Sequence, residues 1–201
     1  MTDAGDGIIS TVTALGSLEI IHRIEPAPVR VPNCPPSAGS SCLLDSRYLY
    51  KMQVFVINFG APISDMTYAR SIDWDNGGYW SYNSLQTLGG DTSYLDRAGD
   101  DGYCQLLESP NPTPVTGVNW EGDTRHLCGP DITLKLGRFE SNDIKFFTIY
   151  FGVAPDAATA LSAVTQVGAQ VYSTGKPLTP DGLANGTPST GVFAIDGSDL
   201  V

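Results

Sequence analysis

The C-terminal third of the chain, Phe146–Ala194, constrains the fold most strongly. It reads as an apolar strand, a short alanine-rich helix at Asp156–Val167, a second strand, a loop rich in Pro, Gly, Ser and Thr, and a closing strand. Asp156 is a residue type that caps helix N-termini well. The stretch holds no obvious nucleophile, base or metal ligand. It therefore predicts a scaffold with one short helix.

Strand patterns recur along the rest of the chain, separated by turn residues. The 201 residues include 22 Gly and 14 Pro, which is typical of a domain with many turns. We predict a mainly β fold, a sandwich or a jelly-roll-like barrel of about seven to nine strands with one short C-terminal helix. The expected strands are residues 8–24 (as one or two strands), 48–59, 66–75, 79–88, 131–139, 143–151, 169–173 and 191–195.

The N-terminal region predicts an extended strand and arm. Residues 8–24 are rich in β-branched side chains, and Pro26, Pro28 and Pro32 follow. Because proline cannot donate to a β-ladder, this run is expected to form a linker or an edge segment. We divide the chain into an N-terminal strand with its Pro-rich arm, residues 1–36, and a β-rich core domain, residues 37–201.

Charge and hydropathy exclude two classes of partner. The net charge of −11 repels phosphate backbones, so we expect no nucleic-acid binding. No apolar run approaches the roughly 20 residues that span a bilayer, so we expect no membrane insertion. The first seven residues lack the basic and apolar regions of a signal peptide. A secreted protein is expected here in its mature form.

The four cysteines favour an oxidising compartment. Cys34 and Cys42 flank one small-residue loop, and Cys104 and Cys128 flank a Pro-rich excursion. Two local disulfides, Cys34–Cys42 and Cys104–Cys128, are therefore predicted. Four free thiols in a cytosolic core are the main alternative. A zinc site is disfavoured because no two cysteines have C-x-x-C spacing.

Two acidic clusters are candidate Ca²⁺ sites, and we expect no other cofactor. Asp73 and Asp75 alternate on one strand, so their carboxylates share a face. Oxygen ligands of this kind suit Ca²⁺, and a carboxylate pair also suits glycoside hydrolysis. A strand end with a turn is the simpler interpretation. Asp96, Asp100 and Asp101 form either a weak Ca²⁺ site or a solvated acidic turn.

Aromatic and polar motifs give weaker indications of glycan contacts. Trp80 and Tyr82 alternate on one strand, where they form either a sugar-stacking platform or part of the core. Asn185 begins an Asn-Gly-Thr triplet, the acceptor pattern for N-glycosylation. Glycans are therefore candidate binding partners.

Three segments of the chain resemble parts of a known type of domain. Residues 70–75 read R-S-I-D-W-D. Residues 147–177 and 186–195 have the pattern of a strand, an alanine-rich helix and a V-G-A-x-V-Y-S-x-G-x-P ending. The chain resembles, over about residues 45–196, a domain of bacterial extracellular and cell-surface proteins. It departs from that pattern after Asp75. The resemblance implies a surface location and a scaffolding or adhesive role, and it carries no catalytic residues.

We therefore expect a non-enzymatic, extracellular structural subunit that polymerises with copies of itself. Gly7–Ile24 would complete a neighbour's sheet by strand exchange, because the Pro-rich arm disfavours folding back as a hairpin. Insertion into the chain's own sheet is the alternative. A carbohydrate-binding module using Trp80 and Tyr82, and a hydrolase using Asp73 and Asp75, are the rival functions. The predicted polymerisation strand contains Ile8, Ile9, Val12, Leu15, Leu18, Ile20 and Ile21.

Overall fold

The computed structural model describes residues 2–3, 9–27, 29–30, 43–44, 49–72, 81–87, 93–99, 120–124, 131–177 and 190–200, and the structural statements below concern these residues. The first strands are β1 (Thr2–Asp3), β2 (Ile9–Leu15), β3 (Leu18–Pro26), β4 (Val29–Arg30), β5 (Leu43–Leu44), β6 (Leu49–Asn58) and β7 (Ile63–Ser71). They are followed by β8 (Ser81–Thr87), β9 (Leu95–Gly99), β10 (Trp120–Thr124), β11 (Asp131–Phe139), β12 (Ile144–Ala154), α2 (Ala157–Gln166), β13 (Val171–Pro177), β14 (Thr190–Asp196) and the 3₁₀ turn η2 (Ser198–Leu200).

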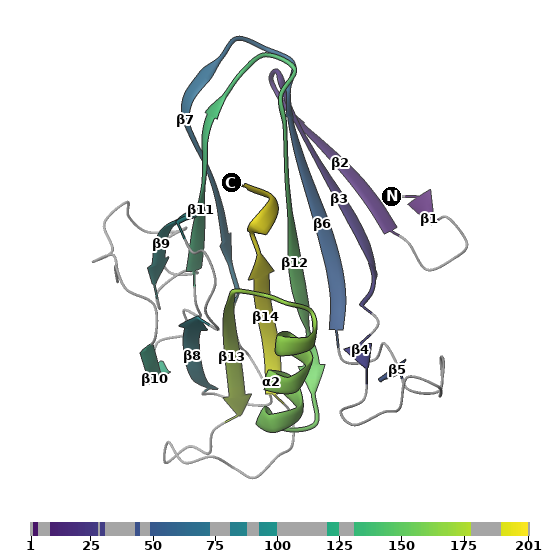
Figure 1. Ribbon diagram of the computed structural model, residues 1–201, viewed down its shortest axis with the longest axis vertical. Coiled ribbons are helices and arrows are strands. Elements are labelled where there is room, and N and C mark those ends of the chain that lie inside the picture. Colours follow the sequence, from purple (N-terminus) through teal and green to yellow (C-terminus); the bar gives the residue numbers. More distant parts are fainter. Residues whose placement is uncertain are drawn as a thin grey trace.

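The described strands form two main antiparallel sheets (Figure 1). The large sheet has the order β1-β2-β3-β6-β12-β14-β13-β8-β10, and the small sheet has the order β7-β11-β9. A third pairing joins β4 to β5. The two main sheets pack as a sandwich that does not close into a barrel. The prediction of a mainly β sandwich with one short helix is confirmed.

The main core lies between the two sheets. On β6, the alternate residues Met52, Val54 and Val56 are buried, as a strand with one inward face requires. They meet side chains from β11 and from the neighbouring strand β12. We call the side of the large sheet that carries these residues its inward face, and the opposite side its outward face. The other core members are Tyr94, Ile132, Leu134, Leu136, Phe139, Phe147, Ile149, Val171, Phe193 and Ile195.

Helix α2 covers one end of the outward face, which gives a third layer (Figure 1). Asp156 begins the helix: its extended backbone and its carboxylate, which accepts a hydrogen bond from the Thr159 N–H at 2.7 Å, form an N-cap. Ala160, Ala163 and Val164 are buried against the sheet in a second apolar cluster. The predicted helix at Asp156–Val167 is therefore confirmed, with Val167 as its C-cap.

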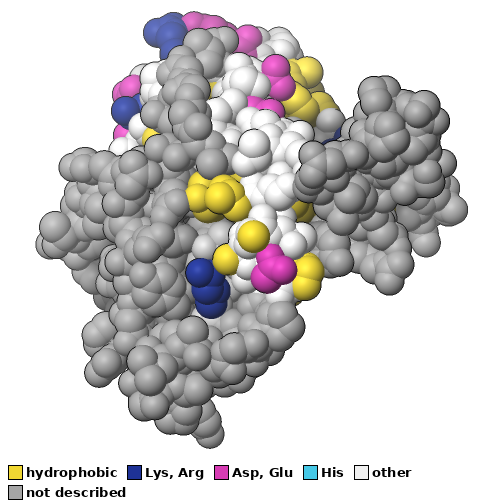
Figure 2. Space-filling model, turned by 60° about the horizontal axis from the view of Figure 1, so that its bottom comes forward, with side chains coloured by type: hydrophobic (Ala, Val, Ile, Leu, Met, Phe, Trp, Pro, Cys, Tyr) yellow, Lys and Arg dark blue, Asp and Glu magenta, His cyan; other side chains and the backbone are white. Residues whose placement is uncertain are grey.

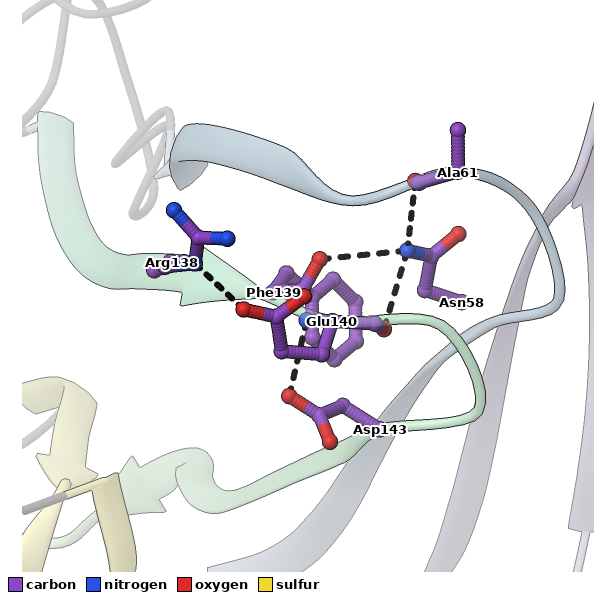
Figure 3. Close-up of polar contacts among 6 residues, drawn as sticks. All are labelled: Asn58, Ala61, Arg138, Phe139, Glu140 and Asp143. Carbon is purple, nitrogen blue, oxygen red and sulfur yellow. Dashed lines mark hydrogen bonds and ion pairs between the residues drawn. The ribbon is translucent and has the colours of Figure 1, made fainter.

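Asn58 fixes the corner where the chain passes from the large sheet to the small one (Figure 3). Its fully buried side-chain amide donates to the carbonyl oxygens of Ala61 at 3.0 Å, Phe139 at 3.2 Å and Glu140 at 3.0 Å. Its side-chain oxygen accepts the Gly60 N–H at 2.9 Å. The β6–β7 and β11–β12 connections are thus tied together by one side chain.

Most expected strands agree with the structure within a few residues. Strand β11 has the predicted bounds, residues 131–139, and the described part of the predicted 8–24 region contains the two strands β2 and β3. Strand β7 ends at Ser71, before the predicted end at residue 75. The sequence analysis did not predict β9 or β10.

Candidate functional site

The N-terminal hairpin, residues 9–26, is the candidate functional site because it forms one side of the large sheet. Strands β2 and β3 pair from Ile9↔Ile24 to Leu15↔Leu18. Gly16, with φ of 63°, occupies the turn in a left-handed conformation that favours glycine. Strand β3 then pairs with β6 of the same chain, so the Pro-rich arm does not prevent the segment from folding back.

One face of β3 packs into the core. Leu18, Ile20 and Ile24 are partly buried against the inter-sheet cluster. At the hairpin tip, the Phe59 N–H donates to the Ser17 carbonyl oxygen at 2.8 Å. The hairpin is therefore held along its length by apolar contacts and at its tip by a backbone hydrogen bond.

His22 is the polar residue on this inward face of β3. Its Nε2 lies 3.4 Å from the Tyr68 hydroxyl of β7. Burial, and then the positive charge of Arg70, lower the pKa of His22 below its ordinary value. Burial raises the pKa of Tyr68, against a smaller opposing effect of Arg70. The hairpin is thus packed against β7 through the contact between the His22 ring and the Tyr68 hydroxyl.

The outward face of the hairpin is partly apolar and partly charged. Val12 is 61% exposed, and its cross-strand partner is Ile21. Farther along β3, Glu25 pairs with Lys51 of β6 at 2.5 Å and with Arg23 at 3.4 Å. These ion pairs lie partly in solvent, so they add little to stability.

The connection between β3 and β6 is much longer than the pairing requires. Pro26 is the cross-strand partner of Tyr50, so the two strands meet where the connection begins and ends. The Ala27 N–H donates to the Leu49 carbonyl oxygen at 2.9 Å. Hairpin loops usually need about two to five residues, yet this connection occupies residues 27–48. Within it, only two residues each of β4 and β5 are described as paired.

The predicted polymerisation strand divides between the two faces of the sheet. Leu18 and Ile20 pack inward, whereas Val12 and Ile21 lie on the outward face. Leu15, beside the turn, is 58% exposed. Ile9 is described only by its backbone pairing, and Ile8 lies outside the described residues.

The predicted metal and glycan residues are mostly outside the described part of the chain. Asp96 is described, and its carboxylate lies 3.7 Å from Lys135 Nζ in an exposed ion pair. Tyr82 is described only by its backbone pairing with Lys176 and Asp123. Among the described residues, no three His, Cys, Asp or Glu side chains form a metal-binding group. The predicted residues outside the described ranges are Asp73, Asp75, Asp100, Asp101, Trp80 and Asn185.

The disulfide prediction stays untested. Cys34, Cys42, Cys104 and Cys128 all lie outside the described residues. In the described part of the chain, no helix has the length and hydropathy that crossing a bilayer requires.

One end of the molecule shows mixed surface chemistry (Figure 2). In this view, the described hydrophobic side chains form small groups, with Lys or Arg and Asp or Glu side chains between and around them. The described surface there carries no extended field of one charge. A row of four apolar residues lies elsewhere, on the outward face of β2, β3, β6 and β12.

Sequence reasoning missed the outward residues Phe55 and Phe146. Their rings are 4.8 Å apart, on neighbouring strands. The alternation in residues 48–59 predicts a strand with two different faces, but it does not identify the strand that pairs with it. That information comes only from the sheet order.

No family model, curated protein or solved structure matches the chain. The resemblance to bacterial cell-surface domains therefore stays a prediction from the residues that carry it. The strand, helix and strand at the centre of that pattern form the β12–α2–β13 unit of the structure.

Proposed function

We propose that this chain is a non-enzymatic structural subunit of an extracellular layer or filament, and that it polymerises by exchanging its N-terminal hairpin with a neighbouring copy. The long connection between β3 and β6 is the main observation that supports this proposal. The last residue of β3 pairs with the second residue of β6, so a short loop would be enough to join the two strands within one chain. Residues 27–48 are much longer than that loop needs to be. A connection of that length also lets β3 reach an equivalent β6 in another copy.

The contacts of β3 are suited to exchange. Leu18, Ile20 and Ile24 pack against the core, and burying an aliphatic side chain contributes roughly 1.5–3 kcal/mol. A hairpin supplied by a neighbour would make the same contacts, so the closed and exchanged states differ little in contact energy. Protein concentration and the properties of the connection then decide which state is populated.

The reach of the connection supports exchange between whole domains. Residues 27–36 alone would span about 30 Å if extended as polyproline II, at about 3.1 Å per residue. Head-to-tail exchange would produce an open filament, because each copy donates one hairpin and receives another. The extracellular assignment rests on the cysteine spacing and on the resemblance to surface domains.

The test uses a cross-strand disulfide as a reporter of which chain supplies β3. Arg23 and Gln53 are cross-strand partners on the outward face. One copy carries Arg23→Cys and a second copy carries Gln53→Cys, and the two are mixed under mild oxidation. Peptide mapping should then recover a bond between positions 23 and 53 that joins two different chains.

The matched control is the double variant Arg23→Cys/Gln53→Cys in one chain, which shows that the geometry permits the bond. If the double variant forms the bond within one chain, and the mixed single variants form none at any concentration, exchange is wrong. Negative-stain microscopy of the wild-type chain should show polymers of varied length.

A further inference from the structure

An apolar row crosses the outward face of the large sheet. Val12 of β2 is opposite Ile21 of β3, Ile21 is opposite Phe55 of β6, and Phe55 is opposite Phe146 of β12. Opposed residues in neighbouring strands point to the same side, so these four side chains share one face. The 4.8 Å separation of the Phe55 and Phe146 rings shows that part of the row is already packed together.

The row lies beyond the part of this face that α2 covers. The helix packs with Leu49, Tyr172 and Val192, toward the opposite end of the strands. Val12 remains 61% exposed, and Ile144, one row farther from the helix, is 60% exposed. Aliphatic side chains exposed to this degree on adjoining rows mark a surface for association.

Opposite charges flank the row at equal distances. On β3, Glu19 and Arg23 are two residues before and two residues after Ile21, so all three point outward. Glu19 forms no ion pair with any described residue, and Arg23 reaches Glu25 at 3.4 Å. The face therefore carries Glu19 on one side of the apolar row, and Arg23 with Glu25 and Lys51 on the other.

This arrangement is complementary to itself under a two-fold rotation. An axis that runs along the row, across the strands, places Val12, Ile21 and Phe55 opposite the same residues of a second copy. The rotation also reverses the strand direction, so that Glu19 of each copy faces Arg23 of the other. Sheets that stack face to face are about 10 Å apart, a separation that side chains of these sizes fill.

We propose that this face binds a second copy of the chain in a two-fold, face-to-face dimer. Charge complementarity selects a second copy as the occupant, since the acid and the base each meet their opposite in the same interface. The interface is distinct from hairpin exchange. An exchanged hairpin would bring Glu19, Ile21 and Arg23 to the same positions, so the dimer forms with or without exchange.

The charge test uses two single variants of the full chain, Glu19→Arg and Arg23→Glu. Each variant alone places like charges opposite each other twice, so its self-association should weaken by at least about tenfold. A mixture of the two restores both opposite-charge pairs. Sedimentation velocity should therefore find stronger association in the mixture than in either variant alone.

The apolar part of the interface has a matched pair of variants on β2. Val12→Lys introduces like charges at the two-fold axis and should abolish the dimer. Leu15→Lys changes an equally apolar residue of similar exposure, 58% against 61%, whose side chain lies on the other side of the strand. That variant should dimerise like the wild-type chain.

Two results would overturn the face-to-face dimer. One is a wild-type chain that sediments as a monomer at every concentration. The other is an association that Val12→Lys and both charge reversals leave unchanged, including one that involves only a different protein. The disulfide reporter of hairpin exchange is read separately, so either proposal can fail while the other survives.

Discussion

The side-chain amide of Asn58 donates a hydrogen bond to the carbonyl oxygen of Phe139, 3.2 Å away. The contact joins the end of β6 to the end of β11, at the edge where the chain passes between the two sheets (Figure 3). The same amide nitrogen reaches the carbonyl oxygens of Ala61 and Glu140, so its two hydrogens serve three acceptors. Because Asn58 is fully buried, water cannot replace these bonds.

Replacing Asn58 with Asp should destabilise the fold by about 2–4 kcal/mol, because buried carbonyl oxygens lose their donor and then face a carboxylate. Urea denaturation should show a lower midpoint with an unchanged slope. Asn142→Asp is the matched control, since the exposed Asn142 side chain donates only to the Ser141 hydroxyl. It should change stability by less than about 0.5 kcal/mol. Equal midpoints for both variants would contradict the role of Asn58.

Gly197 is held against the ring of Tyr94. A β-carbon at position 197 would lie 2.7 Å from three ring carbons, which is closer than real contacts allow. Both residues also converge on Gln170, whose side-chain oxygen accepts the Tyr94 hydroxyl and the Gly197 N–H, each at 2.9 Å. We expect Gly197→Ala to cost about 1–3 kcal/mol through overpacking. Thermal or urea unfolding measures the loss.

A double-mutant cycle separates this clash from other effects of the substitution. In a Tyr94→Ala background the ring is absent, so adding Gly197→Ala should cost little. If the two changes are additive, the contact between residues 94 and 197 is not the cause.

Local patterns predicted much of the fold because several elements have strong signals of their own. The helix is bounded by a capping Asp156 and filled with alanine, and it forms where these signals place it. Strand β11 alternates apolar and polar residues over most of its length, and its bounds agree with the prediction. In the helix and in the second half of β11 the sequence and burial patterns coincide, whereas Asp131 and Thr133 at the start of β11 are polar yet buried.

The sequence analysis did not predict strands β9 and β10 because their sequences have weak strand propensity. The β9 sequence is Leu-Asp-Arg-Ala-Gly, and the β10 sequence is Trp-Glu-Gly-Asp-Thr. Each forms by pairing with a neighbour, β9 with β11 and β10 with β8. Such strands depend on tertiary context more than on intrinsic propensity.

The outward apolar row could not be predicted from the sequence either. Val12, Phe55 and Phe146 are far apart in the chain, and only the strand order and register bring them into line. The sequence did indicate that residues 8–24 form β structure with apolar side chains. It did not show which of those side chains would face the core.

The N-cap of α2 gives a prediction with a pH signature. Hydrogen bonds from Thr159 hold the pKa of the exposed Asp156 carboxyl below its usual value. Its stabilising effect is therefore present above the unfolded-state pKa and is lost as the pH falls through the folded-state value. Asp156→Asn should keep the cap near neutral pH and remove this acid dependence, whereas Asp156→Ala should lower stability at both neutral and acid pH. Circular dichroism during thermal unfolding at the two pH values distinguishes the wild-type chain from the two variants.

Protonation of His22 should link the packing of the N-terminal hairpin, and so the stability of the fold, to pH. The groups that face it are Tyr68 and Arg70 from β7, Val54 from β6 and Thr11 from β2, so Arg70 supplies the one charge among them. Burial and Arg70 lower the pKa of His22 in the folded state. Between that lowered value and the ordinary value of 6.5, the unfolded chain binds more protons than the folded chain. Acidification through this window must therefore destabilise the fold.

The expected result is a free energy of unfolding that is fully maintained above pH 6.5 and declines as the pH is lowered toward the folded-state pKa of His22. The size of the decline is below that of one fully buried proton site, because the imidazole is only partly shielded from solvent. His22→Gln should flatten this part of the stability profile. Urea denaturation of the two chains across the window makes the comparison. Parallel profiles for the wild-type chain and His22→Gln would show that the hairpin is not coupled to pH through this residue.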